Sequence, residues 1–97
     1  MKTKKEYIRI LKESSAVLKD RFKISEMILF GSVARSENTK DSDVDLFVSM
    51  PGEFYLAGEA NDYLESLLDC HVDLIRDHSN ITPYLRSEVK KDGIKIF

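Results

Sequence analysis

The segment from Asp43 to Met50 is largely apolar but begins with alternating acidic and apolar side chains, and this beginning limits the possible fold more than any other feature. Successive side chains of a β-strand point to opposite faces, so Asp43 and Asp45 share one face while Val44 and Leu46 point to the other. The apolar face has to be buried, whereas neighbouring carboxylates repel each other and are costly to desolvate. The segment is therefore predicted to be a strand with one face in the core and the other at a cation.

The remaining apolar residues fall into segments whose spacing alternates between helix and strand. Helices are predicted over residues 3–20, 56–68 and 80–93, a helical turn over 32–35, and strands over 27–30, 43–50, 70–75 and 94–96. Gly93 is predicted to end the last helix in a left-handed conformation. This order predicts an α/β fold, with helices packed on a small mixed sheet, in a single domain over residues 1–97.

Composition argues against several classes of protein. The 97 residues carry a formal net charge of −2, so general basic character, the usual sign of nucleic-acid binding, is absent. No window approaches the roughly 18 consecutive apolar residues of a membrane span. Cys70 is the only cysteine, which rules out an internal disulfide, and no apolar signal-peptide segment follows the basic N-terminal residues. We expect a cytoplasmic protein.

A third carboxylate, Asp73, lies in the predicted strand over residues 70–75. If this strand is adjacent to the strand that carries Asp43 and Asp45, the three carboxylates converge. Oxygen ligands suit Mg²⁺, which usually takes a further ligand from a bound phosphate. Three carboxylates on neighbouring strands are typical of sites in which two metal ions bridge an in-line phosphoryl displacement.

Gly31 and Ser32 follow the first predicted strand and open the predicted helical turn. Glycine lets the backbone approach a ligand closely, and amides at a helix start bind anions together with a serine hydroxyl. Arg35 and Lys40 follow in the next loop, where either could contact phosphates. With the carboxylates, these residues predict a site for Mg²⁺ and a nucleoside triphosphate. Taken singly, each feature has an ordinary explanation: a Gly-Ser pair is usually a turn, an Asp-x-Asp unit a solvated strand end, and Asp73 an exposed edge residue.

The spacing of these residues resembles the DNA polymerase beta-type nucleotidyltransferase superfamily. A glycine–serine pair at Gly31, ten further residues and an Asp-x-Asp unit at Asp43, with Asp73 on the next strand, form its motif. The stretch FGSVARSENTKDSDVDLFV is similar to the minimal nucleotidyltransferases, the MNT group, and the resemblance covers nearly the whole chain. Ser36 departs from the pattern, because this group often has glycine after the arginine.

The resemblance implies a minimal polymerase beta-like nucleotidyltransferase fold and a role for each residue of the motif. Asp43 and Asp45 would bind two Mg²⁺ ions on a nucleoside triphosphate, usually ATP. Asp73 would bind the catalytic ion and help to deprotonate the acceptor hydroxyl. Gly31 and Ser32 would hold the β- and γ-phosphates. The acceptor oxygen would then attack the α-phosphorus and release pyrophosphate.

The resemblance also implies a partner. MNT proteins are commonly paired with a helical HEPN protein, often a ribonuclease toxin, and serve as its antitoxin. In some pairs the MNT protein transfers AMP to a tyrosine of the toxin, and we expect this function here. Two alternatives stay open: a binding module that neutralises a partner by contact alone, and a nucleotidyltransferase whose acceptor is a small molecule such as an aminoglycoside, or an RNA end.

Overall fold

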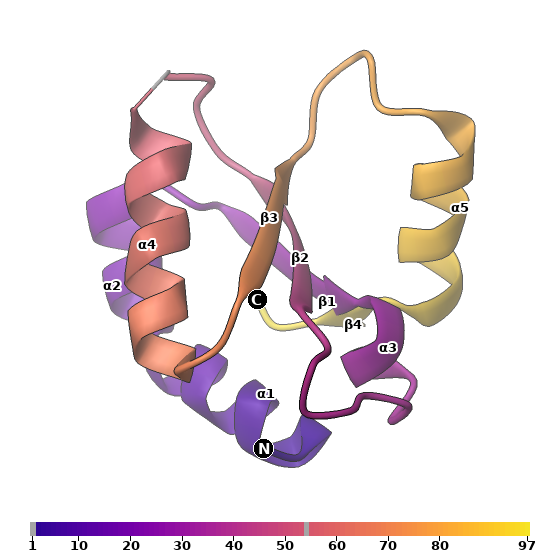
Figure 1. Ribbon diagram of the computed structural model, residues 1–97. Helices are drawn as coiled ribbons and strands as arrows, with labels where there is room; N and C mark the ends of the chain where they lie inside the picture. Colours follow the sequence, from indigo (N-terminus) through magenta and orange to yellow (C-terminus); the bar gives the residue numbers. More distant parts are fainter. Residues whose placement is uncertain (1, 54) are drawn as a thin grey trace.

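The computed structural model describes residues 2–53 and 55–97, and its centre is a four-stranded mixed sheet (Figure 1). The strands are β1 (Glu26–Phe30), β2 (Val44–Ser49), β3 (Val72–Arg76) and β4 (Ile94–Lys95), in the order β3-β2-β1-β4. Strand β1 is antiparallel to both β2 and β4, whereas β2 is parallel to β3. The predicted mixed α/β fold and the predicted edge strand near the C-terminus are confirmed.

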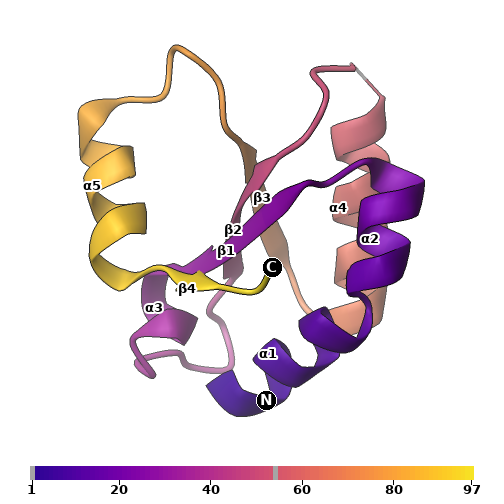
Figure 2. The same ribbon diagram turned by 180° about the vertical axis from the view of Figure 1, so that it is seen from behind.

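Helices lie on both faces of the sheet. Helices α1 (Lys4–Glu13), α2 (Ser15–Phe22) and α4 (Leu56–Leu68) cover one face, and α3 (Gly31–Ala34) and α5 (Pro83–Asp92) lie on the other side (Figures 1 and 2). The larger core fills the space between the three-helix side and the sheet. Its fully buried members include Leu11, Leu18, Met27, Leu29, Val44, Leu46, Val48, Leu64 and Leu68. Within the described residues, no helix has both the length and the apolar character needed to cross a membrane.

The side chains of β2 alternate between the two faces as predicted. Val44, Leu46 and Val48 are fully buried in the larger core. Phe47 points the opposite way and forms a smaller apolar cluster with Phe30 and Val89. Strand alternation places Asp45 on the same face as Phe47, so this carboxylate lies on the thinly covered side of the sheet.

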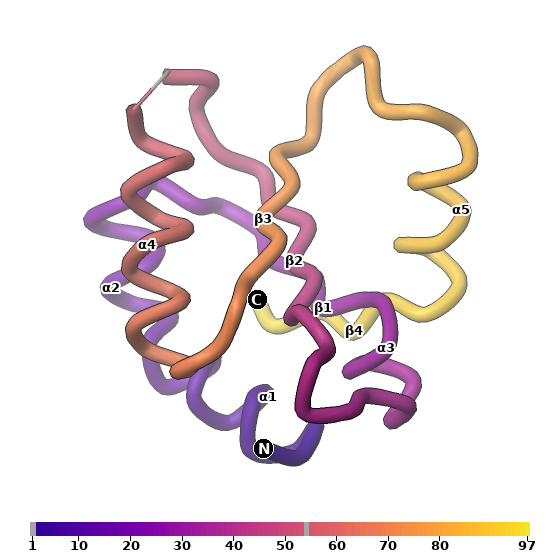
Figure 3. The backbone as a smooth tube through the Cα atoms, in the orientation of Figure 1, coloured from indigo at the N-terminus to yellow at the C-terminus, as the bar shows by residue number. Residues whose placement is uncertain are grey.

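The single helix predicted over residues 3–20 is wrong, because the chain bends at Ser14 between α1 and α2 (Figure 3). Ser14 and Ser15 are weak helix formers, since serine side chains compete for nearby backbone hydrogen bonds. Leu11 of α1 and Leu18 of α2 are both completely buried, so both helices pack on the core across the bend. Leu11 and Leu18 are seven residues apart and would also share one face of a continuous helix, so their apolar spacing does not predict the bend.

The left-handed conformation predicted for Gly93 is also wrong. Gly93 has φ −65° and ψ 134°, which is extended backbone. A Cβ at this position would overlap the carbonyl oxygen of Val89 and approach Ile28 Cγ2 to 2.8 Å. Glycine is required here because the Val89 carbonyl at the end of α5 occupies the space of a Cβ, with Ile28 of β1 beside it, and not because of its freedom to adopt positive φ.

Candidate active site

Asp45 of β2 and Asp73 of β3 are register partners in the parallel strand pair. Adjacent strands lie about 4.8 Å apart, so two such side chains on one face are immediate neighbours. Asp45 is half-buried and Asp73 is exposed. The condition on which convergence of the carboxylates depended, that the two strands are adjacent, is therefore met, with one carboxylate at the edge of the core and one in solvent.

The surroundings of Asp45 disfavour its ionised form. Burial has the largest effect and, with the negative charges of Asp73 and Asp43, raises the pKa of Asp45 to about 6, while Arg35 acts in the opposite direction. A bound cation would relieve both the burial penalty and the repulsion. Closely placed carboxylate oxygens are also the ligand type that Mg²⁺ prefers, so the chemistry of these donors fits this ion.

Asp43 has a different position from the other two carboxylates. It lies just before β2 and is exposed, although the sequence predicted that the strand would begin there. Within residues 2–53 and 55–97, no three His, Cys, Asp or Glu side chains are already placed to hold a metal ion. The fold thus pairs Asp45 with Asp73 and leaves Asp43 at the margin, where its charge acts on Asp45.

The glycine–serine turn lies directly against this carboxylate pair. Phe30, the last residue of β1, is the register partner of Asp45, and the chain turns into α3 at the next residue. Gly31 has φ +78°, and a Cβ there would overlap Oδ2 of Asp45 and approach its Cγ to 3.0 Å. Ser32 is half-buried in α3, and its carbonyl accepts a 2.8 Å hydrogen bond from the Glu37 amide. The turn and the carboxylates therefore form one contiguous site.

Arg35 follows α3 and is held by two carboxylates. Its Nε donates to Glu37 Oε1 at 2.6 Å and its Nη1 donates to Asp92 Oδ2 at 3.0 Å. The Asp92 side chain is only 12% exposed, whereas that of Glu37 is 62% exposed. Asp92 thus ties the loop after α3 to the end of α5. The sequence reasoning missed both partners of Arg35, and a local pattern could not have identified Asp92, which is 57 residues away.

Lys40 lies in a different environment from Arg35. It lines a small polar hollow of about 180 Å³ together with Tyr7, Asp69 and Cys70. The charged groups that act on Asp45 include Arg35 but not Lys40. Of the two cations predicted to meet phosphates, the structure brings only Arg35 close to the carboxylate pair.

Comparisons with known proteins agree with this arrangement. The family model described as "Nucleotidyltransferase domain" matches residues 11–96. A provisionally named protein adenylyltransferase of Methanocaldococcus jannaschii is 37% identical over 100 residues, which cover 99% of this chain and 100% of that protein.

Solved structures show the same fold. A provisionally named minimal nucleotidyltransferase superposes with a TM-score of 0.75 at 32% identity, over 92% of both chains. A chain from a complex of tri-AMPylated HEPN toxin of Shewanella oneidensis with MNT antitoxin superposes with a TM-score of 0.66 at 21% identity, over 93% of this chain and 71% of that one. With the family match over most of its length, the chain belongs to the nucleotidyltransferase domain family, and its fold is that of the minimal nucleotidyltransferases.

Proposed function

We propose that this nucleotidyltransferase is a Mg²⁺-dependent protein adenylyltransferase that transfers AMP from ATP to a hydroxyl, in particular a tyrosine hydroxyl, of a partner protein. The observation that carries the proposal is the contact between the Gly31 turn and Asp45, with Asp73 as the register partner of Asp45. A backbone turn that accepts an anion and a carboxylate pair that needs a cation suit the two ends of a metal-bound triphosphate.

In this proposal Asp45 and Asp73 hold the metal, and Asp43 completes the ligand set from the strand entrance. Mg²⁺ would supply charge neutralisation on the triphosphate and its leaving group. The raised pKa of Asp45 supports this assignment, since burial and the charges of Asp73 and Asp43 raise the free energy of the ionised carboxylate, which a bound cation would lower. Gly31 and Ser32 hold the β- and γ-phosphates, and Arg35 approaches the phosphates from the next loop.

The reaction would be an in-line displacement at the α-phosphorus. The acceptor oxygen forms a new bond to this phosphorus while the bond to the oxygen between the α- and β-phosphates breaks. Pyrophosphate leaves with that oxygen, and Asp73 accepts the hydroxyl proton. Asp73 is suited to this role because it is exposed beside Asp45, where an acceptor from solvent can reach it. Catalysis would rest on positioning of the two reactants and on neutralisation of the developing charge.

The partner class is proposed from the relatives. The Methanocaldococcus jannaschii relative, which this chain matches over its whole length, carries a protein adenylyltransferase name. The solved complex, one chain of which has the fold of this chain, joins an AMPylated HEPN toxin to an MNT antitoxin. We extend both to this chain: its partner is a helical HEPN-type toxin, and the chain acts as the antitoxin.

Transfer of label from ATP tests the proposed function. The purified chain is incubated with Mg²⁺, a candidate HEPN-type partner protein and ATP labelled at the α-phosphorus. We expect label on a tyrosine of the partner and released pyrophosphate. The partner should stay unlabelled when EDTA is added, and also when the label is on the γ-phosphorus, which leaves with the pyrophosphate.

A paired substitution separates transfer from neutralisation by contact. Asp43→Ala together with Asp45→Ala should abolish labelling and also leave the toxin active. The exposed Asp62 of α4 provides a control, since Asp62→Ala removes a carboxylate far from the site. If the paired variant still neutralises the toxin completely, the chain acts by contact and the proposed catalytic role is wrong.

A further inference from the structure

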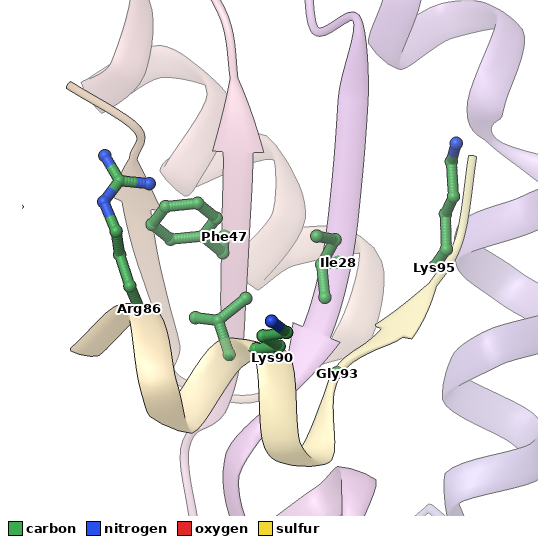
Figure 4. A pocket seen from close by; sticks show the side chains of 7 residues that line it. Ile28, Phe47, Arg86, Lys90, Gly93 and Lys95 are labelled. Carbon is green, nitrogen blue, oxygen red and sulfur yellow. The ribbon is translucent and has the colours of Figure 1, made fainter. Parts of the chain in front are cut away.

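A groove of about 320 Å³ opens between α5 and strands β1, β2 and β4 (Figure 4). Its floor is apolar and consists of Ile28, Phe47 and Val89. The groove lies on the sheet face that also carries Asp45, because Asp45 and Phe47 are two residues apart on β2. Their Cα atoms are about 7 Å apart at the ordinary rise of a strand, so the groove is near the candidate active site.

The rim of the groove is positively charged. Arg86 and Lys90 of α5 and Lys95 of β4 line it, and none of the described residues that line it is acidic (Figure 4). A local excess of positive charge in a chain with a net charge of −2 favours a negatively charged ligand at this place.

Neighbouring carboxylates compensate this charge only in part. Arg86 Nη2 is paired with Asp77 Oδ1 at 2.8 Å, and Lys95 Nζ lies 3.7 Å from Glu26 Oε2, with both members of the second pair well exposed. Exposed pairs of this kind contribute little, so Lys95 can exchange its partner for a ligand carboxylate. Lys90 is in none of the ion pairs among the described residues.

We propose that this groove binds an acidic segment of the acceptor protein. An apolar or aromatic side chain of the segment lies on Ile28 and Phe47, and its carboxylates meet Lys90 and Lys95. An extended segment advances about 3.3 Å per residue, so a hydroxyl two or three residues along the chain reaches the carboxylate pair. The inference rests on the proposed function, for which it names the acceptor as a tyrosine with acidic neighbours.

The floor of the groove favours a peptide over a nucleic acid. Ile28 and Val89 are aliphatic and suit an apolar side chain, whereas single-stranded nucleic acids use several aromatic side chains for base stacking. Three cations in one groove are also fewer than the basic stripe that a nucleic-acid backbone follows. We therefore assign the groove to a protein segment.

The test uses a fluorescein-labelled peptide in which a tyrosine lies two residues after a leucine, with glutamates between them and on both sides. Lys90→Glu reverses a charge of the rim, and Lys91→Glu is the matched control, because Lys91 is exposed on the same helix but does not line the groove. In fluorescence anisotropy, we expect wild type and Lys91→Glu to bind alike and Lys90→Glu to bind about tenfold more weakly. A peptide with lysines in place of the glutamates should not bind.

Several results would overturn the assignment: no saturable binding of the acidic peptide to wild type, equal effects of the two charge reversals, or tighter competition by a single-stranded oligonucleotide. Circular dichroism checks that the variants are folded, and Lys90→Gln, with a smaller loss of affinity, replaces Lys90→Glu if the latter is not. Calorimetric titration with ATP and Mg²⁺ separates the two proposals. ATP binding without peptide binding contradicts the groove alone, and peptide binding without ATP binding contradicts the proposed function alone.

Discussion

Gly31 and Asp45 are packed so closely that no side chain fits between them: a Cβ at residue 31 would overlap Asp45 Oδ2 and lie 3.0 Å from its Cγ. The contact arises because β1 ends at the register partner of Asp45 and the chain then turns at φ +78°. Two separate demands therefore fall on one glycine, a left-handed conformation and contact with a carboxylate. Because of this contact, the Gly31 turn and the strand that carries Asp45 form a single structural unit.

Gly31→Ala should lower both stability and nucleotide binding. The new methyl group has to displace the Asp45 carboxylate, and alanine is strained at positive φ, which together cost about 2 kcal/mol in the free energy of unfolding. Urea denaturation measures this loss, and calorimetry measures the affinity for ATP with Mg²⁺. Gly58→Ala is the control, because a Cβ at Gly58 meets no atom within 4 Å and α4 should become slightly more stable. Equal free energies of unfolding for Gly31→Ala and Gly58→Ala would contradict the close contact of Gly31 with Asp45.

The raised pKa of Asp45 predicts that this carboxylate destabilises the metal-free protein at neutral pH. Its folded pKa of about 6 exceeds the ordinary aspartate pKa of 3.8, so between these values the folded protein binds more protons than the unfolded chain. The free energy of unfolding should therefore fall as pH rises through this window. Allowing for solvent screening, the fall is about 1–2 kcal/mol and is complete above pH ~6.

Asp45→Asn isolates this contribution. The variant should be more stable than wild type at pH 7 and lose the advantage at about pH 4, where the native carboxyl is protonated. Urea denaturation at both pH values, with Asp62→Asn as the exposed control on α4, provides the measurement. A constant difference between Asp45→Asn and wild type at both pH values would contradict the assigned pKa.

Mg²⁺ should stabilise the wild-type protein at pH 7 and have no such effect on Asp45→Asn. A ligand that binds only the folded state raises the melting temperature by mass action, and the crowded carboxylates gain most from the ion. The measurement is thermal unfolding with and without Mg²⁺ and again after addition of EDTA. In Asp43→Asn, Mg²⁺ should still raise the melting temperature, but by less than in wild type, because Asp43 is exposed at the strand entrance. An equal shift in wild type and Asp45→Asn would exclude a site at Asp45.

The Arg35–Asp92 pair should contribute more to stability than the Arg35–Glu37 pair. Asp92 is largely buried and connects α5 to the loop after α3, whereas Glu37 is exposed and belongs to the same loop as Arg35. We expect Asp92→Asn to lower the free energy of unfolding by about 1 kcal/mol and Glu37→Gln by only a few tenths. Urea denaturation of the two variants compares the pairs directly. Equal losses in the free energy of unfolding would show that α5 is not held through Arg35.

Local periodicity was sufficient to predict most of the fold and the central pair of the candidate site. The alternation around Asp45 assigns its face, and the apolar segment around Asp73 identifies the neighbouring strand. What the sequence could not reveal depends on contacts between distant segments. Asp92 meets Arg35 only because α5 returns to α3, and Ile28 of β1 adds to the crowding that the Val89 carbonyl creates at Gly93. The bend at Ser14 likewise has no signal in the apolar spacing of the two helices.

Ser36, the departure from the family pattern, has a conformation that favours glycine. It follows Arg35 at φ +60°, and its amide donates to the Val33 carbonyl at 3.0 Å, which closes the turn after α3. A serine in this left-handed region costs about 1–2 kcal/mol, while glycine avoids this cost but loses more backbone entropy on folding. Ser36→Gly should therefore raise the free energy of unfolding by about 0.5–1 kcal/mol.

Ser79→Gly is the control for this prediction, because Ser79 is also an exposed loop serine but is not among the residues at positive φ. Urea denaturation should show a gain for Ser36→Gly and no gain for Ser79→Gly. Ser36 lies in the loop that presents Arg35, so the affinity for ATP with Mg²⁺ should stay within about twofold of wild type if the loop keeps its course. A loss of stability in Ser36→Gly would mean that the serine side chain holds this loop, and the strain assigned to its backbone would be wrong.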